Sequence, residues 1–235
     1  MPPSLRDLTV VFDLDGTLID TAPDLAAATN HALGLAGLEP VSIAELHPHI
    51  GYGSRVMIEA GLRLHGVAVT KEELNRLHDA FLHFYADNIA IGSRPFEGIP
   101  ELIDALQAFG ARLAVCTNKY EGLSKSLLLQ LGLDTRFGAI AGRDTFAVCK
   151  PDPGHLTGAI AMAGGKPTHA VMVGDSEVDF ATAAAAGVPS IGVTFGYTPV
   201  PVRELKPTAV IDHYREFMGA LEKVLAERGR TRRQR

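Results

Sequence analysis

Short apolar runs alternate with longer stretches of helical periodicity over most of the chain. The apolar runs are rich in valine, isoleucine and alanine, and each has the length of one buried strand. They predict strands at residues 8–12, 112–116, 139–141, 170–173, 190–193 and 209–211. Helical patterns lie between several of these runs, at residues 100–109, 121–131, 154–163 and 177–186. This alternation predicts an α/β fold, in which helices cover both faces of a doubly wound parallel sheet.

Residues 22–91 depart from this alternation, because they contain helical patterns without a convincing strand between them. The amphipathic helices are predicted at residues 25–38, 54–64 and 71–89. Thr70 and Glu73 have the spacing of a capping box at the start of the last of these helices. We therefore expect a helical cap domain inserted after the first strand. The expected division is a core of residues 1–21 and 92–227, a cap of residues 22–91, a returning linker at 92–95 and a basic tail at 228–235.

The composition is that of a folded protein with an acidic body. The 235 residues are 46% hydrophobic and 21% charged, which suits a chain with a substantial core. Five of the 22 basic residues are arginines in the tail, so the rest of the chain carries 17 basic against 27 acidic residues. Such a body argues against general nucleic-acid binding, which needs a basic surface. The tail itself is expected to be a disordered end.

Neither a membrane location nor an oxidising compartment is indicated. The first residues lack the apolar segment of a signal peptide, and no uninterrupted apolar stretch is long enough to span a bilayer. The two cysteines, Cys116 and Cys149, have neither metal-ligand spacing nor the pattern of a disulfide framework. We therefore expect a cytoplasmic protein, which the sequence leaves free to be a monomer or a homodimer.

The first apolar run ends in two carboxylates, Asp13 and Asp15, followed by Gly16 and Thr17. Residues two apart on an extended segment point to the same side, so the two aspartates begin on one side of the chain. Two like charges at the end of a buried strand are costly to desolvate, and a divalent cation would relieve that cost. The alternative is a structural one, in which Asp-Gly forms a hairpin turn between two strands.

Polar side chains also follow three further predicted strands. They are Thr117-Asn118-Lys119 after the second strand, Lys150 beyond the third, and Asp175 after the fourth, with Asp179 one helical turn later. Each group alone has a plain structural reading, as a turn, a helix cap or a solvated lysine. In an open parallel sheet, however, ligands bind at the carboxyl ends of the strands. Their joint placement therefore predicts a single site at that edge of the sheet.

These motifs resemble those of the haloacid dehalogenase superfamily. The resemblance covers nearly the whole chain except the tail. It is carried by Asp13-Leu14-Asp15-Gly16-Thr17, Thr117-Asn118, Lys150 and Gly174-Asp175-Ser176-Glu177-Val178-Asp179. A narrower likeness to bacterial phosphoglycolate phosphatases is carried by Gly51-Tyr52-Gly53, Gly142-Arg143-Asp144-Thr145, Lys150-Pro151-Asp152-Pro153 and Gly196-Tyr197. Arg143 departs from that family, which often has glycine at this position.

The resemblance implies a catalytic role for each motif residue. Asp13 would be the nucleophile that forms an aspartyl-phosphate. Asp15 would protonate the leaving alkoxide and then deprotonate the hydrolytic water. Thr117 would donate a hydrogen bond to a phosphoryl oxygen, and Asn118 would support that loop or the leaving group. Lys150 would supply a compact positive charge to the phosphate.

Mg²⁺ is the cofactor that the resemblance implies, because it prefers hard oxygen ligands. Asp13 and Asp175 would supply carboxylates, and Asp15 would supply its backbone carbonyl. Asp179 would contact and orient these ligands, rather than bind the metal directly. The cap would close over the site and exclude water.

The substrate implied by the narrower likeness is 2-phosphoglycolate, a small phosphorylated metabolite. Its carboxylate would need a cation or N–H donors, and Arg55, just after Gly51-Tyr52-Gly53, is the candidate for that role. Pyrophosphate or another phosphorylated metabolite remains an alternative, because related enzymes share the same core motifs. A receiver-like signalling domain phosphorylated on Asp13 is the alternative from another class, but such domains lack the helical insertion. A dehalogenase is disfavoured by Asp15.

Overall fold

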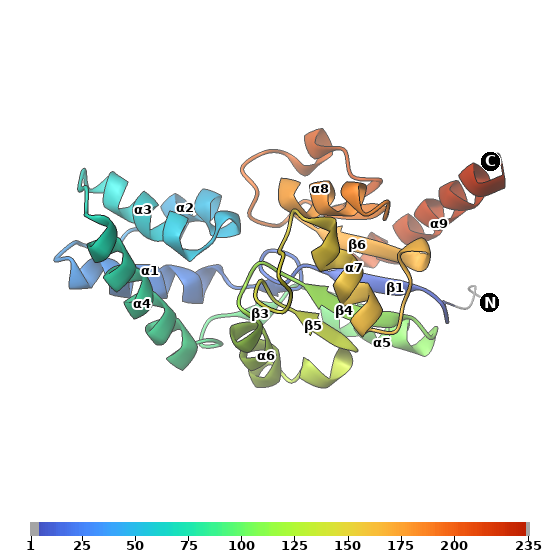
Figure 1. Ribbon diagram of the computed structural model, residues 1–235, viewed down its shortest axis with the longest axis horizontal. Coiled ribbons are helices and arrows are strands. Elements are labelled where there is room, and N and C mark those ends of the chain that lie inside the picture. Colours follow the sequence, from blue (N-terminus) through green and yellow to red (C-terminus); the bar gives the residue numbers. More distant parts are fainter. Residues whose placement is uncertain (1–4, 234–235) are drawn as a thin grey trace.

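Six parallel strands form the central sheet of the protein, in the order β5-β4-β1-β6-β7-β8 (Figure 1). The computed structural model describes residues 5–233, with side chains described as far as residue 227. The strands are β1 (Thr9–Phe12), β4 (Arg112–Cys116), β5 (Ala139–Ala141), β6 (Ala170–Gly174), β7 (Ser190–Val193) and β8 (Ala209–Ile211). All neighbouring pairs are parallel, which confirms the predicted α/β fold and, to within a residue at each end, the predicted strands.

Apolar side chains of β1 alternate between the two faces of the sheet. Val10 and Phe12 belong to one cluster of buried residues, and Val11 belongs to the other. The first face is covered by α5 (Ile99–Ala108), α6 (Glu121–Gln130) and α9 (Phe217–Arg233), and the second by α7 (Pro153–Met162) and α8 (Glu177–Ala185). Burial on both faces explains why the strands read as continuous apolar runs in the sequence.

The strand order reverses between β1 and β6. The chain passes from β1 outward through β4 and β5, returns through α7, and continues from β6 outward on the other side. The register pairs Phe12 with Val173, and the N–H of Asp13 donates a hydrogen bond of 2.9 Å to the carbonyl oxygen of Val173. The carboxyl ends of β1 and β6 therefore lie side by side at the switch point, where open α/β sheets bind their ligands.

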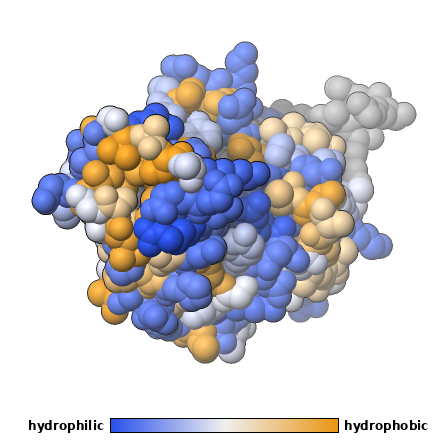
Figure 2. All heavy atoms as spheres, turned by 60° about the vertical axis from the view of Figure 1, so that its left-hand side comes forward, coloured by the Kyte–Doolittle hydropathy of each residue, from blue (hydrophilic) through white to orange (hydrophobic). Residues whose placement is uncertain are grey.

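Helices also make up the segment between β2 (Ile19–Asp20) and β3 (Arg94–Pro95), two short strands that pair antiparallel. They are α1 (Ala22–Leu35), α2 (Ile43–Leu46), α3 (Ser54–Leu64) and α4 (Lys71–Asp87), with the 3-10 helix η1 (His47–Tyr52) between α2 and α3. The helices pack on one another to one side of the sheet, at the left of Figure 1. From their side, the surface shows separate hydrophobic patches around a broad hydrophilic area (Figure 2).

Several details of this helical segment differ from the sequence prediction. Helix α1 spans Ala22–Leu35 rather than residues 25–38, and α4 ends at Asp87 rather than at residue 89. The short α2 and η1 were not predicted, because four to six residues carry too little periodicity. The capping box at Thr70 is only half formed: the Thr70 hydroxyl accepts a hydrogen bond from the N–H of Glu73, at 3.2 Å. The Glu73 carboxylate pairs with Arg76 instead, at 2.7 Å, so it does not return a hydrogen bond to Thr70.

Helix α9 was not predicted either, although its buried side chains follow a helical spacing. Phe217, Leu221 and Val224 are all buried, in the same cluster as Val10 and Phe12 of β1. The backbone of α9 continues to Arg233, within the segment expected to be a disordered tail. Residues 234 and 235 of that tail lie outside the described residues. Among the described residues, no helix is both long and apolar enough to cross a membrane.

Asp24 holds the returning linker against the start of α1. Its carboxylate accepts hydrogen bonds from the N–H of Gly92 at 2.7 Å and from the N–H and hydroxyl of Ser93 at 2.8 and 2.6 Å. A Cβ on Gly92 would lie 2.7 Å from Cβ of Pro23, so only glycine fits there. Asp24 is buried, and its loss would leave these donors without a partner.

Replacing Asp24 with alanine should therefore lower the free energy of unfolding by about 2–4 kcal/mol, measured by urea denaturation. The matched control is Asp79→Ala, since Asp79 is an exposed aspartate on α4. The control should change stability by less than about 0.5 kcal/mol. Equal stability of the two variants would show that the Asp24 contacts do not hold the linker.

Candidate active site

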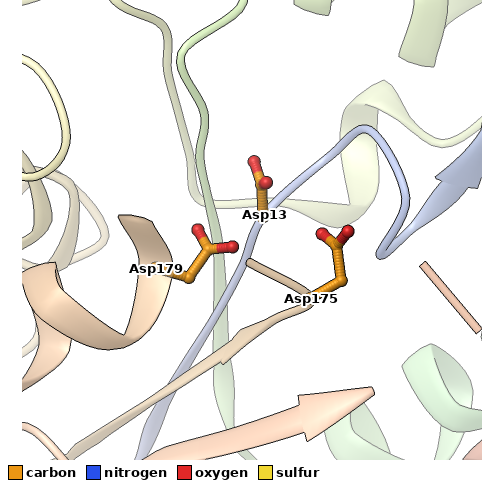
Figure 3. Close-up of side chains that lie close together, drawn as sticks. All are labelled: Asp13, Asp175 and Asp179. Carbon is orange, nitrogen blue, oxygen red and sulfur yellow. The ribbon is translucent and has the colours of Figure 1, made fainter. Parts of the chain in front are cut away.

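Three buried carboxylates meet at the switch point of the sheet. Asp13 follows β1, Asp175 follows β6, and Asp179 lies in the first turn of α8. Their carboxylate groups point toward the same region beyond the strand ends (Figure 3). One oxygen from each group lies within 4.8 Å of the others, close enough to share one metal ion. The structure thus brings together three of the aspartates that the sequence singled out.

Lys150 is the cation that contacts this cluster directly. Its Nζ lies 2.9 Å from Oδ1 of Asp13 and 2.6 Å from Oδ1 of Asp179, and its side chain is buried. Burial alone would lower the pKa of Lys150, but Asp13 and Asp179 raise it above its usual range. Lys150 therefore carries a positive charge at neutral pH, as a phosphate-binding lysine requires.

One ammonium does not balance three carboxylates. Burial raises the pKa of Asp13 well above its usual range, although Lys150 opposes this shift. Burial also raises the pKa of Asp175, and the nearby charges of Asp179 and Asp13 add to the effect. Both upward pKa shifts reflect the cost of gathering negative charge away from water. A divalent cation would remove that cost, and carboxylate oxygens are the ligands that Mg²⁺ prefers.

The contacts of each carboxylate show which of its oxygens the protein already uses. Both protein contacts of Asp13 fall on Oδ1, from Lys150 and from the N–H of Leu14 at 2.7 Å. Within the described residues, Oδ2 of Asp13 has no hydrogen-bond partner. Asp175 accepts one hydrogen bond on each oxygen, from the hydroxyl of Thr17 at 3.1 Å and the N–H of Tyr197 at 2.7 Å. Asp13 thus has an open oxygen, and each Asp175 oxygen keeps a lone pair.

Asp179 is more fully used by the protein. Its Oδ1 accepts from Lys150, and its Oδ2 accepts from the N–H and hydroxyl of Ser176 at 3.1 and 2.7 Å. A Cβ on Gly174 would lie only 2.5 Å from Cβ of Asp179, so the glycine lets α8 begin this close to β6. These contacts suit a residue that fixes Lys150 and the start of α8.

Asp15 lies apart from the cluster, because the chain leaves strand geometry before reaching it. Strand β1 ends at Phe12, and Gly16 has a positive φ of 78°. The Asp15 carboxylate accepts hydrogen bonds from Nζ of Lys119 at 2.9 Å and from the hydroxyl of Thr21 at 2.7 Å. A Cβ on Gly16 would approach the Asp175 carboxylate to 2.8 Å. The chain after Phe12 therefore turns closely beside Asp175, and the Asp15 carboxylate contacts Lys119 and Thr21 instead of the cluster.

Lys119 is a site residue to which the sequence analysis gave no role. Its side chain is 6% exposed, and its Nζ lies 4.5 Å from the ring centre of Tyr85 in α4. Burial would lower the pKa of Lys119, but Asp15 and Tyr85 raise it above its usual range. Lys119 thus joins the core to the helical segment. Its position beside Thr117-Asn118 was the available signal, but nothing in the sequence pairs it with Asp15.

The loops after β4 and β5 are joined to each other near the cluster. Thr117 is buried, and its N–H donates to the carbonyl oxygen of Ala141 at 3.0 Å. The side-chain amide of Asn118 donates to the carbonyl oxygen of Lys150 at 2.9 Å. Asn118 thus makes the kind of contact that a loop-supporting role requires.

His155 supports the Lys150 loop by a hydrogen bond, and nothing in the sequence distinguishes this histidine from the others. Its Nδ1 accepts a hydrogen bond from the N–H of Lys150 at 3.1 Å. Its Nε2 lies 3.0 Å from the carbonyl oxygen of Gly142, which can only accept, so the neutral ring carries its proton on Nε2. Burial lowers the pKa of His155, and the charge of Lys150 lowers it further.

A cavity of about 260 Å³ lies between these loops and the helical segment. Residues of the core supply one side, including Asp13, Asp15, Thr117, Asn118, Lys119, Arg143, Lys150 and Asp175. Residues of the helical segment supply the other, including Leu25, Gly51, Tyr52, Gly53, Ser54, Met57, Phe81 and Tyr85. The predicted site residues of the core, apart from Asp179, therefore line a common space.

Arg55 is not among the residues that line this cavity. Its guanidinium donates a hydrogen bond of 2.9 Å to Oδ1 of Asn75 in α4. Arg143, which departs from the family pattern, does line the cavity. Its guanidinium lies 5.2 Å from the ring centre of Tyr120.

The comparisons with known proteins agree with this fold. A family model for haloacid dehalogenase-like hydrolases matches residues 10–193. The phosphoglycolate phosphatase of Mesorhizobium japonicum is 50% identical over 219 residues, which cover 93% of this chain and 95% of the relative. That of Agrobacterium fabrum is 46% identical over 93% of this chain and 94% of its own.

Among solved structures, a predicted phosphoglycolate phosphatase from Haemophilus somnus matches with a TM-score of 0.84 and 30% identity, over 92% of this chain and 97% of its own. The chain therefore belongs to the haloacid dehalogenase-like hydrolase family. Within that family it is a phosphatase, as the named relatives and the acidic site together indicate.

The neutral state of His155 predicts a pH dependence of stability. Because its pKa is lowered in the folded protein, the unfolded chain binds a proton on His155 more readily, and the contribution of His155 to stability is lost as the pH drops through about 6.5. His78 contributes in the same direction, since burial also lowers its pKa. The raised pKa values of Asp13 and Asp175 act in the opposite direction, so the contribution of His155 is measured by comparing variants. In His155→Gln, the loss of unfolding free energy between pH 7 and pH 5 should be smaller than in the wild type. The control is His169→Gln, at an exposed histidine, which should lose as much unfolding free energy as the wild type. If His155→Gln loses the same amount as the wild type, His155 is not held neutral in the folded protein.

Proposed function

We propose that this phosphatase hydrolyses a small phosphomonoester, 2-phosphoglycolate, with Mg²⁺ and through an aspartyl-phosphate on Asp13. The main support is the difference between the two carboxylate oxygens of Asp13. Its Oδ1 is held by Lys150 and the N–H of Leu14, whereas its Oδ2 has no hydrogen-bond partner among the described residues. A carboxylate fixed at one oxygen and open at the other, beside a buried ammonium and a cavity, is suited to attack phosphorus.

In the first half-reaction, Oδ2 of Asp13 forms a bond to phosphorus as the bond from phosphorus to the ester oxygen breaks. Asp15, which lines the same cavity, gives a proton to the departing alkoxide, so its carboxyl must take up that proton and open its ion pair with Lys119 before the reaction. The hydroxyl of Thr117 donates a hydrogen bond to a phosphoryl oxygen, and Lys150 balances the negative charge that collects there. In the second half-reaction, Asp15 takes a proton from a water that attacks phosphorus, and inorganic phosphate leaves Asp13.

Mg²⁺ bound by the carboxylates of Asp13 and Asp175 and the backbone carbonyl of Asp15 would mask the repulsion between the nucleophile and the phosphate. The excess of buried carboxylates over ammonium groups supports this assignment. Asp179 would hold Lys150 and the start of α8 in place, since both its oxygens accept hydrogen bonds from the protein.

Residues 22–91 would act as the cap that excludes water during the reaction. Support comes from the cavity, which lies between the helical segment and the strand ends, and from Tyr85 of α4, which contacts Lys119 of the core. Pyrophosphate and other phosphorylated metabolites remain the alternative substrates. A receiver-like signalling domain no longer fits, because the chain belongs to a hydrolase family and carries the helical insertion. The cytoplasmic location stays a prediction from the sequence, which leaves both a monomer and a homodimer open.

The carboxylate of 2-phosphoglycolate needs a positive partner of its own, and the cavity offers Arg143. Lys119 and Lys150 both line the cavity, but each is already in an ion pair with an aspartate. Arg143 has no ion-pair partner among the described residues, and it lines the cavity together with Gly53 and Ser54 at the start of α3. That helix start has no side-chain cap, and helix N-termini favour anions. These observations favour Arg143 over Arg55 for the carboxylate.

Asp13→Asn should lower the rate of phosphate release by about 10³-fold or more, because the amide cannot replace the nucleophilic carboxylate. The measurement is inorganic phosphate released with Mg²⁺ from 2-phosphoglycolate, pyrophosphate and p-nitrophenyl phosphate. Asp212→Asn, at an exposed aspartate, is the matched control and should keep wild-type turnover. Wild-type turnover by Asp13→Asn would show that Asp13 is not the nucleophile. Faster phosphate release by the wild type from pyrophosphate than from 2-phosphoglycolate would overturn the substrate assignment.

Arg143→Ala should raise KM for 2-phosphoglycolate by about tenfold or more, since a hydrogen-bonded charge pair with the carboxylate is lost. KM for 2-hydroxyethyl phosphate, in which an uncharged hydroxymethyl group replaces the carboxylate, should stay near the wild-type value. Arg55→Ala is the comparison variant, and it should affect both substrates little. If Arg55→Ala rather than Arg143→Ala selectively weakens 2-phosphoglycolate, the original sequence prediction is the correct one.

A further inference from the structure

Tyr197 contacts the acidic cluster with one end. With the other end it contacts residues 20–22, the outgoing linker from the core to the helical segment, whereas residues 92–95 form the returning linker. Tyr197 follows β7 in the chain and is 2% exposed. Its backbone N–H donates to Oδ2 of Asp175 at 2.7 Å. Its phenolic oxygen accepts hydrogen bonds from the N–H groups of Thr21 at 2.6 Å and Ala22 at 3.0 Å, and donates to Oδ1 of Asp20 at 2.7 Å. One residue thus spans the distance from the proposed metal ligand to the linker.

The phenol of Tyr197 takes the place of a helix cap. The N-cap residue of α1, Thr21, makes no side-chain capping bond, because its hydroxyl donates to Asp15 instead. The first N–H groups of α1 are therefore bound by a side chain from the core. Asp20, the acceptor of the phenol, lies opposite Arg94 where strand β2 pairs with the returning strand β3. The phenol consequently contacts the place where both linkers leave the core.

The ring of Tyr197 has little room to move. A Cβ on Gly16 would lie 2.9 Å from Cδ2 of Tyr197, and a Cβ on Gly196 would lie 2.2 Å from Cβ of Asp175. His47 of η1 packs edge-on against the ring, with centroids 5.1 Å apart. A closely packed group cannot shift at one end without moving the other. Displacement of Asp175 would therefore reach the start of α1.

We propose that Tyr197 is a positioning residue that couples the occupancy of the metal site at Asp175 to the conformation of the linkers, and so to the position of the cap. The proposal rests on the proposed function, because it takes Asp175 as a metal ligand. Cation binding fixes the Asp175 carboxylate, and the phenol passes that constraint to Asp20, Thr21 and Ala22. Coupling between two sites is reciprocal. The factor by which cation binding stabilises the held linker is therefore the factor by which the held linker strengthens cation binding, and loosening the linker at this phenol must weaken cation binding.

Hydrogen exchange of backbone amides, measured with and without Mg²⁺ alone, tests this coupling. In the wild type, Mg²⁺ should slow exchange at Tyr197, Thr21 and Ala22 together. Tyr197→Phe keeps the backbone N–H to Asp175 but removes the phenol. Exchange at Thr21 and Ala22 should then become about tenfold faster or more and stop responding to Mg²⁺, while the dissociation constant for Mg²⁺ rises several-fold.

Tyr214→Phe is the matched control. Tyr214 is also a buried tyrosine, and its phenol donates to the carbonyl oxygen of Thr17 at 2.7 Å without touching the linkers. This control should keep wild-type exchange at Thr21 and Ala22 and the wild-type response to Mg²⁺. Asp20→Ala is the second variant, to be used if Tyr197→Phe fails to fold. It removes the acceptor of the phenol and leaves Tyr197 in place, and it should also weaken the effect of Mg²⁺ on exchange at Thr21 and Ala22.

The outcomes separate this proposal from the proposed function. If Mg²⁺ slows exchange at Tyr197 but leaves Thr21 and Ala22 unchanged in the wild type, the coupling is wrong and the metal site stands. The coupling is also wrong if Tyr197→Phe, or Asp20→Ala in its stead, responds to Mg²⁺ as the wild type does. If Mg²⁺ changes none of the three amides, both the metal assignment and the coupling fall.

Discussion

The concentration of negative charge at the switch point is the constraint on which the rest of the site depends. Asp13, Asp175 and Asp179 are buried within reach of one another, and Lys150 is the ammonium that pairs with two of them. Such a cluster is unfavourable in a protein interior unless cations and N–H groups surround it. The neighbouring loops supply donors from Leu14, Thr17, Ser176 and Tyr197, and glycines bring those loops close enough to do so.

The helical segment is joined to this cluster by polar contacts as well as by packing. Asp15 pairs with Lys119, which lies over the ring of Tyr85 in α4, and Thr21 at the first linker donates to the same Asp15 carboxylate. Asp24 holds the second linker through Gly92 and Ser93. A change in charge at the site therefore has a direct physical route to the linkers. This arrangement is what a phosphatase needs if water is to be excluded only while the phosphate is bound.

Most of the sheet and most helices could be predicted because their signals are local. Buried parallel strands are continuous apolar runs, and residues 112–116, 139–141, 190–193 and 209–211 were predicted with the observed bounds. The pair β2 and β3 could not be found, since two residues carry no period. The capping box at Thr70 failed in part because Arg76, one turn further on, competes for Glu73. Local patterns do not reveal which of two partners a side chain will choose.

The sequence by itself determined which chemistry gathers at one edge of the sheet. Asp13, Thr117, Lys150 and Asp175 each follow a predicted strand, and parallel strands bring their carboxyl ends together whatever the details of the loops. Only the tertiary structure decided that Asp15 turns away to Lys119, that His155 supports Lys150, that Arg143 rather than Arg55 lines the cavity, and that Tyr197 reaches from Asp175 to α1. Apart from His155, each of these depends on residues far apart in the chain, and their approach is set by packing, which no local periodicity encodes.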